Sequence, residues 1–170
     1  MKYRCVIFLL SILIFTGVEA AQAVSREAAL QAIEVFQKDP AGTDGLTAAT
    51  TIMAFVQKSD EVHLSLSKAV VPWLKSKDAP DADTRSLLLT AYVAGNARAQ
   101  LQSGKAEDDV YAGWQQVLST YAQLQHINPT VKLPEIDDLK AKEKGGTLHS
   151  CATTILAQQK TEGGAQNSNH

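Results

Sequence analysis

Cysteine is scarce in this sequence of 170 residues, which contains only Cys5 and Cys151. Cys5 lies in an N-terminal segment that we expect to be removed, so the remaining chain has one thiol and no internal disulfide. The fold must then be held by its apolar core alone. We expect Cys151 to be a buried structural residue, because it falls in the apolar stripe of a predicted helix. A reactive thiol or a disulfide between two chains is the alternative.

Long apolar runs are also scarce. The longest, residues 5–14, matches the core of a signal peptide and falls well short of the roughly 20 residues that a membrane-spanning helix needs. A short basic start precedes this run, and residues 21–23 (Ala-Gln-Ala) follow it with the small-x-small pattern of a cleavage site. We therefore predict a signal peptide over residues 1–23, cleavage after Ala23, and a secreted or periplasmic protein with no membrane span in its mature chain. Cleavage after Ala20 and an uncleaved membrane anchor are the alternatives.

An excess of positive charge is missing as well. The sequence has 16 lysines and arginines against 18 aspartates and glutamates, and removal of residues 1–23 leaves a net charge of −3. A protein that binds nucleic acid needs a strongly basic face. We therefore expect no nucleic-acid partner.

The motifs of metal, haem and serine-nucleophile sites do not occur. There is no Cys-x-x-Cys, no His-Glu-x-x-His and no Gly-x-Ser-x-Gly, and His63, His126 and His149 fall on different predicted helices. We therefore predict no metal site and no cofactor.

Acidic residues do occur in pairs, at 60–61, 108–109 and 137–138. Each pair lies in the first turn of a predicted helix, where capping and the helix dipole explain it without catalysis. A glycosidase acting on the cell wall would need two carboxylates facing each other across a cleft, and Glu107, Asp108 or Glu135 could supply one. Because no catalytic constellation is evident, we predict that the protein is not an enzyme.

The spacing of apolar residues is helical throughout the chain after residue 23, and no segment alternates as a strand does. This pattern predicts an all-α fold, a single-domain antiparallel bundle of about six helices over residues 24–160, with a disordered tail over residues 161–170. A short helical solenoid is the alternative, but no repeat supports it. The segments that we expect to be helical are 25–38, 44–58, 60–75, 84–102, 108–126, 135–144 and 147–159.

A strip of small residues marks the predicted helix 84–102. Ala91, Gly95 and Ala99 recur every four residues on one face. A glycine inside a helix costs about 1 kcal/mol relative to alanine, and close approach of a second helix is the simplest compensation. We expect the helix over 108–126 to run back antiparallel and to cover this strip.

The ends of several predicted helices carry capping or stop signals. We expect Ser25 to cap the first helix, Gly104 to end the helix that contains the strip, and Asp108 to cap the next. Pro72 falls inside the apolar pattern of residues 60–75 and is expected to kink the last turn of that helix.

Arg98 is the polar residue that fits its surroundings least, because it projects near the edge of the packing face. One interpretation is an arginine whose head reaches solvent or pairs with an acid such as Asp109. The other is an anchor for an anionic ligand or for the carboxylate of a partner. The candidate binding residues are Arg98, Tyr92, Asn96, Trp114 and Trp73.

Three functional hypotheses follow. The first is an exported, non-enzymatic module that binds a protein partner in the cell envelope or periplasm. The second is a carrier of a small molecule or lipid, with a pocket between the small-residue strip and the aromatic residues Trp73, Trp114 and Tyr121. The third is an enzyme that acts on the cell wall.

Overall fold

The computed structural model describes residues 23–75 and 81–166, and in these ranges the chain forms α-helices, one short 3-10 helix (η1) and no β-strand. The predicted all-α fold is therefore confirmed. Most of the predicted signal peptide (residues 1–22) and the end of the predicted tail (residues 167–170) lie outside the described ranges. The elements are α1 (Arg26–Lys38), α2 (Thr43–Val56), η1 (Pro72–Lys75), α3 (Ala82–Ser103), α4 (Val110–Ile127), α5 (Pro134–Lys144) and α6 (Leu148–Gln166).

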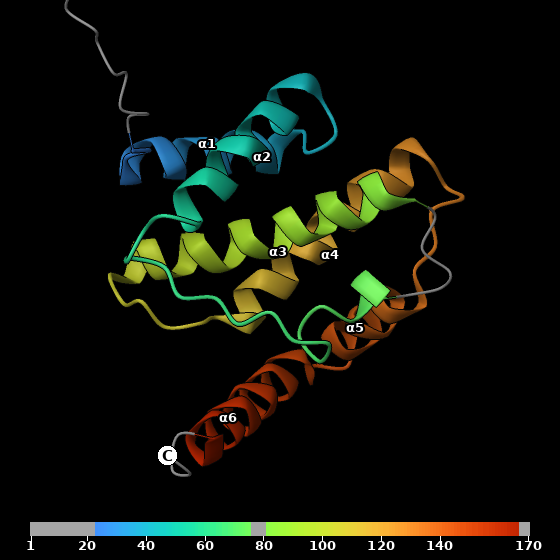
Figure 1. Ribbon diagram of the computed structural model, residues 1–170. Helices are drawn as coiled ribbons and strands as arrows, with labels where there is room; N and C mark the ends of the chain where they lie inside the picture. The colour runs from blue at the N-terminus through green and yellow to red at the C-terminus, as the bar shows by residue number, and fades with distance from the viewer. Residues whose placement is uncertain (1–22, 76–80, 167–170) are drawn as a thin grey trace, which may run out of the picture.

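The α3–α4 hairpin lies at the centre of the bundle (Figure 1). The α1–α2 hairpin packs against α3, while α5 and α6 pack against α4. The two central helices are antiparallel: Tyr92 contacts Gly113, and Asn96, further along α3, accepts a hydrogen bond from the backbone of Asp109, just before α4 begins. The expected pairing of these two helices is therefore confirmed.

Gly95 is the point at which the backbone of α4 touches α3. A Cβ atom on Gly95 would lie 2.4 Å from the carbonyl oxygen of Ala112 and 2.6 Å from the Cβ of Gln116. Side chains do not approach so closely, so only glycine fits here. Ala91 and Gly95 are fully buried, so the strip does not form an open groove there, whereas Ala99, at its end, is half-buried and borders a small cavity described below.

The pocket expected between this strip and three aromatic residues is therefore absent from the described fold. Trp73, Trp114 and Tyr121 are each no more than 2% exposed and belong to the core. That expectation was wrong because the close approach of α3 and α4 fills the space that the pocket would occupy.

The helix ends follow the sequence in most places. The side chain of Ser25 accepts from the backbone N–H of Ala28 at 3.2 Å, and Gly104 ends α3 with a φ of 69°, which favours glycine. The expected cap at Asp108 is wrong by one residue. Asp109 caps α4, accepting from the N–H of Ala112 at 2.9 Å.

The largest difference between the predicted and the observed fold lies in residues 57–71, which we call the strap. A helix was expected over 60–75, but only Pro72–Lys75 is helical, as η1. Leu66, which the helical stripe would bury, is 54% exposed. The helical spacing of apolar residues here is coincidental, because tertiary hydrogen bonds hold the strap in a different conformation.

Side chains of the central hairpin satisfy the backbone of the strap. The Gln100 side-chain amide donates to the carbonyl of His63 at 2.7 Å and accepts from its N–H at 2.8 Å. Asp108 accepts from the N–H of Ser65 at 2.9 Å and from the side-chain amide of Asn96. These bonds replace those that a helix would make, since buried backbone groups must be paired.

The last helix, α6, extends away from the rest of the bundle (Figure 1). Leu148 and Ala152 are buried, whereas Cys151, Ile155 and Leu156 are half-buried. The helix continues beyond the expected boundary at residue 160. In the described part of the chain, no helix is both long enough and apolar enough to cross a membrane.

Candidate functional site

An apolar groove with a volume of about 460 Å³ opens on the surface between η1, α5 and α6. Three local features shape it. Pro72 begins η1, Pro134 begins α5 at a first helical position that suits proline, and the half-buried face of α6 forms the far wall. The apolar residues that line the groove are Ala69, Pro72, Trp114, Leu139, Cys151 and Ile155.

Trp114 is one of the lining residues, and a hydrogen bond to the strap holds it in place. Its indole N–H donates to the carbonyl of Val70 at 2.7 Å, and its side chain is 2% exposed. The neighbouring Trp73 is fully buried, and its indole nitrogen has no partner among the described residues. A fixed tryptophan in a partly open apolar site is typical of binding surfaces.

Charged side chains also line the groove. Lys142 and Asp138, one turn apart on α5, form an ion pair, and Lys68 is exposed on the strap. Glu135 lies at the start of α5, and one of its carboxylate oxygens, Oε2, is buried without a hydrogen-bond partner among the described residues. The groove therefore combines apolar and charged lining residues, as protein–protein interfaces do.

Cys151 lines this groove and is half-buried, so the expectation of a buried structural cysteine is corrected. The apolar stripe along α6 is wider than the face of that helix that packs on the core. Leu148 and Ala152 take the core positions, and Cys151 and Ile155 are left on the flank that faces the groove.

No protein-family model, curated protein or solved structure matches this chain. The function must therefore be argued from the residues of the cavities themselves. In the described ranges, no three histidine, cysteine or carboxylate side chains gather closely enough to hold a metal ion.

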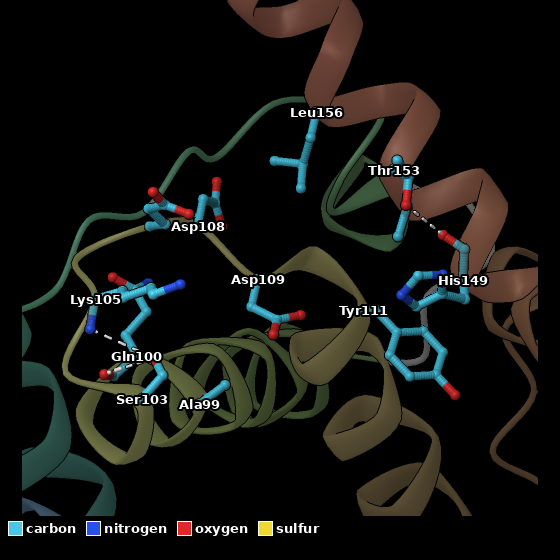
Figure 2. A pocket seen from close by; sticks show the side chains of 12 residues that line it. Ala99, Gln100, Ser103, Lys105, Asp108, Asp109, Tyr111, His149, Thr153 and Leu156 are labelled. Carbon is cyan, nitrogen blue, oxygen red and sulfur yellow. Dashed lines mark hydrogen bonds between the residues drawn. The ribbon is translucent and has the colours of Figure 1, made fainter.

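A second cavity, of about 250 Å³, lies between α6 and the loop that joins α3 to α4. Figure 2 shows Asp108 and Asp109 on the loop side, with His149, Thr153 and Leu156 on α6. The ring of His149 packs edge to face against Tyr111, from α4, with ring centres 4.9 Å apart. This contact ties the start of α6 to α4.

The carboxylates of this second cavity come from one segment, residues 107–109, and the α6 side contributes none. Asp108 accepts a hydrogen bond from the backbone of Ser65 in the strap, and Asp109 caps α4. In the groove, too, both carboxylates, Glu135 and Asp138, come from one helix. Neither cavity has the facing carboxylates that glycosidases use.

Two of the sequence-predicted binding residues, Tyr92 and Asn96, lie together in the core. Both are fully buried, and the Asn96 side-chain amide donates to the Tyr92 hydroxyl at 3.1 Å and to Asp108. Burial, with the nearby Asp108 carboxylate, raises the pKa of Tyr92. These residues hydrogen-bond to Asp108 and Gln100, the two side chains that bind the strap, and a ligand on the surface does not reach them.

Arg98 reaches towards α1, away from Asp109. Its guanidinium donates to the side-chain oxygen of Gln37 at 2.5 Å, and Gln37 in turn donates to Gln116 at 2.6 Å. The five predicted residues therefore do not form one site. Of them, only Trp114 lines the groove, and Trp73 lies in η1 beside it.

The groove residues Glu135 and Leu139 on α5 were not among the predicted binding residues. The sequence does contain a relevant signal at Glu135, which follows Pro134 at the start of a helix and was interpreted only as a candidate carboxylate for a glycosidase. The groove depends on how the strap, α5 and α6 meet, and no short-range pattern encodes that meeting.

Proposed function

We propose that the protein is an exported, non-enzymatic module that binds a protein partner in the cell envelope or periplasm. The observation that supports the proposal is the groove, which is lined by apolar residues such as Leu139 and Ile155 together with charged side chains. Apolar surface gathered in one concave place on a soluble domain marks a binding site more often than chance exposure does.

Export is supported by the way α1 begins. Val24 packs against the core and Ser25 caps the helix, and cleavage after Ala23 would leave both of these contacts in the mature chain. The basic, apolar and small-residue regions of residues 1–23 supply the signal itself.

Two neighbouring threonines provide a matched test. Thr153 and Thr154 are both exposed on α6, and each donates its hydroxyl to the carbonyl four residues earlier, yet only Thr154 lines the groove. A tryptophan at either position changes helix α6 in the same way, but Thr154→Trp projects into the groove and Thr153→Trp into the second cavity.

Affinity capture from an envelope extract should use the wild type, Thr154→Trp and Thr153→Trp side by side. We expect a partner that is recovered by the wild type and by Thr153→Trp and lost with Thr154→Trp. Equal recovery by all three proteins, or no recovery by any of them over a range of salt concentrations, would rule out the groove as the partner's site.

A small-molecule carrier is the second candidate, because a volume of about 460 Å³ is in the range of roughly 300–1,000 Å³ typical of small-ligand pockets. Native mass spectrometry of freshly purified protein distinguishes the two functions. A carrier shows a bound mass that Thr154→Trp removes, whereas a protein-binding module shows the mass of the bare chain.

A further inference from the structure

A pocket with a volume of about 350 Å³ lies where α1 begins, against the start of the strap (Figure 1). Ala23 and Val24, which flank the bond that we expect to be cleaved, both line it. Asp60 and Glu61, from the strap, line the same pocket, and Glu61 forms an ion pair with Arg26 at 2.8 Å. The fold therefore brings two carboxylates to the point at which the predicted mature chain starts.

Of the two carboxylates, Asp60 is the one without a cationic partner among the described residues. It is exposed, so a new partner reaches it without displacing a packed side chain. Residues 1–22 supply no partner in the mature chain, because cleavage removes them. Asp60 lies beside Leu101 and Gly104, at the end of α3. The gap in the described ranges before Asp81 is at the other end of that helix of 22 residues, about 30 Å away.

Lys58 is the remaining charged residue that lines the pocket, and it forms no ion pair with Asp60 in the described structure. Its ammonium group stands on a flexible, exposed side chain, so an ion pair would cost side-chain entropy. An ammonium on the backbone nitrogen of Val24 avoids that cost. Val24 packs against the core and Ser25 caps α1, so the nitrogen between Ala23 and Val24 is already held beside the pocket.

Hydrolysis of the bond between Ala23 and Val24 adds one water across it. Ala23 leaves with a carboxylate, and Val24 keeps an amine that is mostly protonated at neutral pH, because α-amines have a pKa of about 7.7–8.0. We propose that this ammonium pairs with Asp60, so that removal of the signal peptide completes the contact between the start of α1 and the strap. The pairing offsets the unfavourable placement of a cation at the positive end of the α1 dipole. This inference rests on the export part of the proposed function.

The pKa of the Val24 α-amine in the exported protein measures the pairing, because a neighbouring carboxylate stabilises the charged amine. Nuclear magnetic resonance of protein carrying ¹³C-labelled valine follows the Val24 Cα signal as the pH is raised through the titration of the amine. We expect Asp60→Asn to lower the pKa of this amine by about 0.5, as suits an exposed ion pair. Asp60→Glu keeps a carboxylate and should preserve most of the effect.

Asp44→Asn is the matched control. Asp44 is also an exposed aspartate, but it lies in the first turn of α2 and does not line the pocket. Its replacement removes the same charge from the protein and should leave the pKa of the Val24 amine unchanged. High salt should shrink the difference between the wild type and Asp60→Asn, because salt screens exposed charges. The dispersion of the amide spectrum shows whether each variant is folded.

The outcomes separate this inference from the proposed export. If Val24 is the first residue and Asp60→Asn changes the pKa of its amine no more than Asp44→Asn does, the pairing is wrong and export stands. If the exported protein begins at Ala21, export also stands, but the pairing is overturned because Val24 has no free amine. A protein that keeps Met1 overturns both the pairing and the cleavage.

Discussion

Replacing Gly95 by alanine tests the packing on which the whole bundle depends. In an open helix this change gains about 1 kcal/mol of stability, because alanine is the better helix former. Here the new Cβ would lie 2.4 Å from the carbonyl oxygen of Ala112, where ordinary contact begins near 3.4 Å. The α3 and α4 backbones must move apart, since a carbonyl on a helix cannot rotate away.

The cost of that separation exceeds the gain. Overpacking a well-packed core costs about 1–3 kcal/mol, and a clash with backbone belongs near the upper end of that range. We therefore expect Gly95→Ala to lower the free energy of unfolding by about 2 kcal/mol after the propensity gain is subtracted. At roughly 2–4 °C per kcal/mol for a chain of this size, Tm should fall by about 4–8 °C.

Urea denaturation followed by circular dichroism measures this change. Ala122→Gly, on the exposed face of α4, calibrates the propensity effect in the same hairpin and should cost about 1 kcal/mol. A Gly95→Ala protein as stable as the wild type, or more stable, would refute the close approach of α3 and α4.

Three further predictions concern the strap, a helix cap and export. Gln100→Leu leaves the N–H and the carbonyl of His63 without partners. It should therefore lower the free energy of unfolding by about 2 kcal/mol or more and speed hydrogen exchange at the His63 amide. Unchanged exchange at that amide would contradict the role of Gln100 in holding the strap. Asp81 caps α3, and the hydrogen bonds that its carboxylate accepts, first of all from the backbone N–H of Thr84, lower its pKa. Its contribution to the stability of the fold is therefore present at neutral pH and is lost as the pH falls below about 4. Asp81→Ala should therefore cost about 1 kcal/mol at pH 7 and less at pH 3 in urea denaturation, and an equal cost at both pH values contradicts this. Mass spectrometry of the exported protein should find Val24 as the first residue; a first residue at Met1 contradicts cleavage.

The sequence predicted the fold well where local signals and packing agree. Ser25, Gly104 and Pro134 mark helix ends through their own backbone chemistry, and Gly95 marks the α3–α4 contact because a glycine in a helix needs compensation. These signals act within one turn, or across one hairpin, and are therefore legible in the sequence.

The strap was mispredicted for a physical reason. Its apolar residues have helical spacing, but Gln100 and Asp108, about 40 residues further along the chain, offer its backbone better partners than a helix would. The error carried over to the site, because Val70 positions Trp114 and Pro72 borders the groove only in this conformation. Long-range hydrogen bonds of this kind leave no periodic pattern in the sequence.

Site-specific photo-crosslinking in the cells that produce the protein tests the binding groove most directly. A photoreactive phenylalanine derivative at position 154 points into the groove, and the same group at position 153 faces the second cavity. We predict one discrete adduct to a partner protein from position 154, and none or a far weaker one from position 153. No adduct from position 154, or equal adducts from both positions, would contradict binding in the groove.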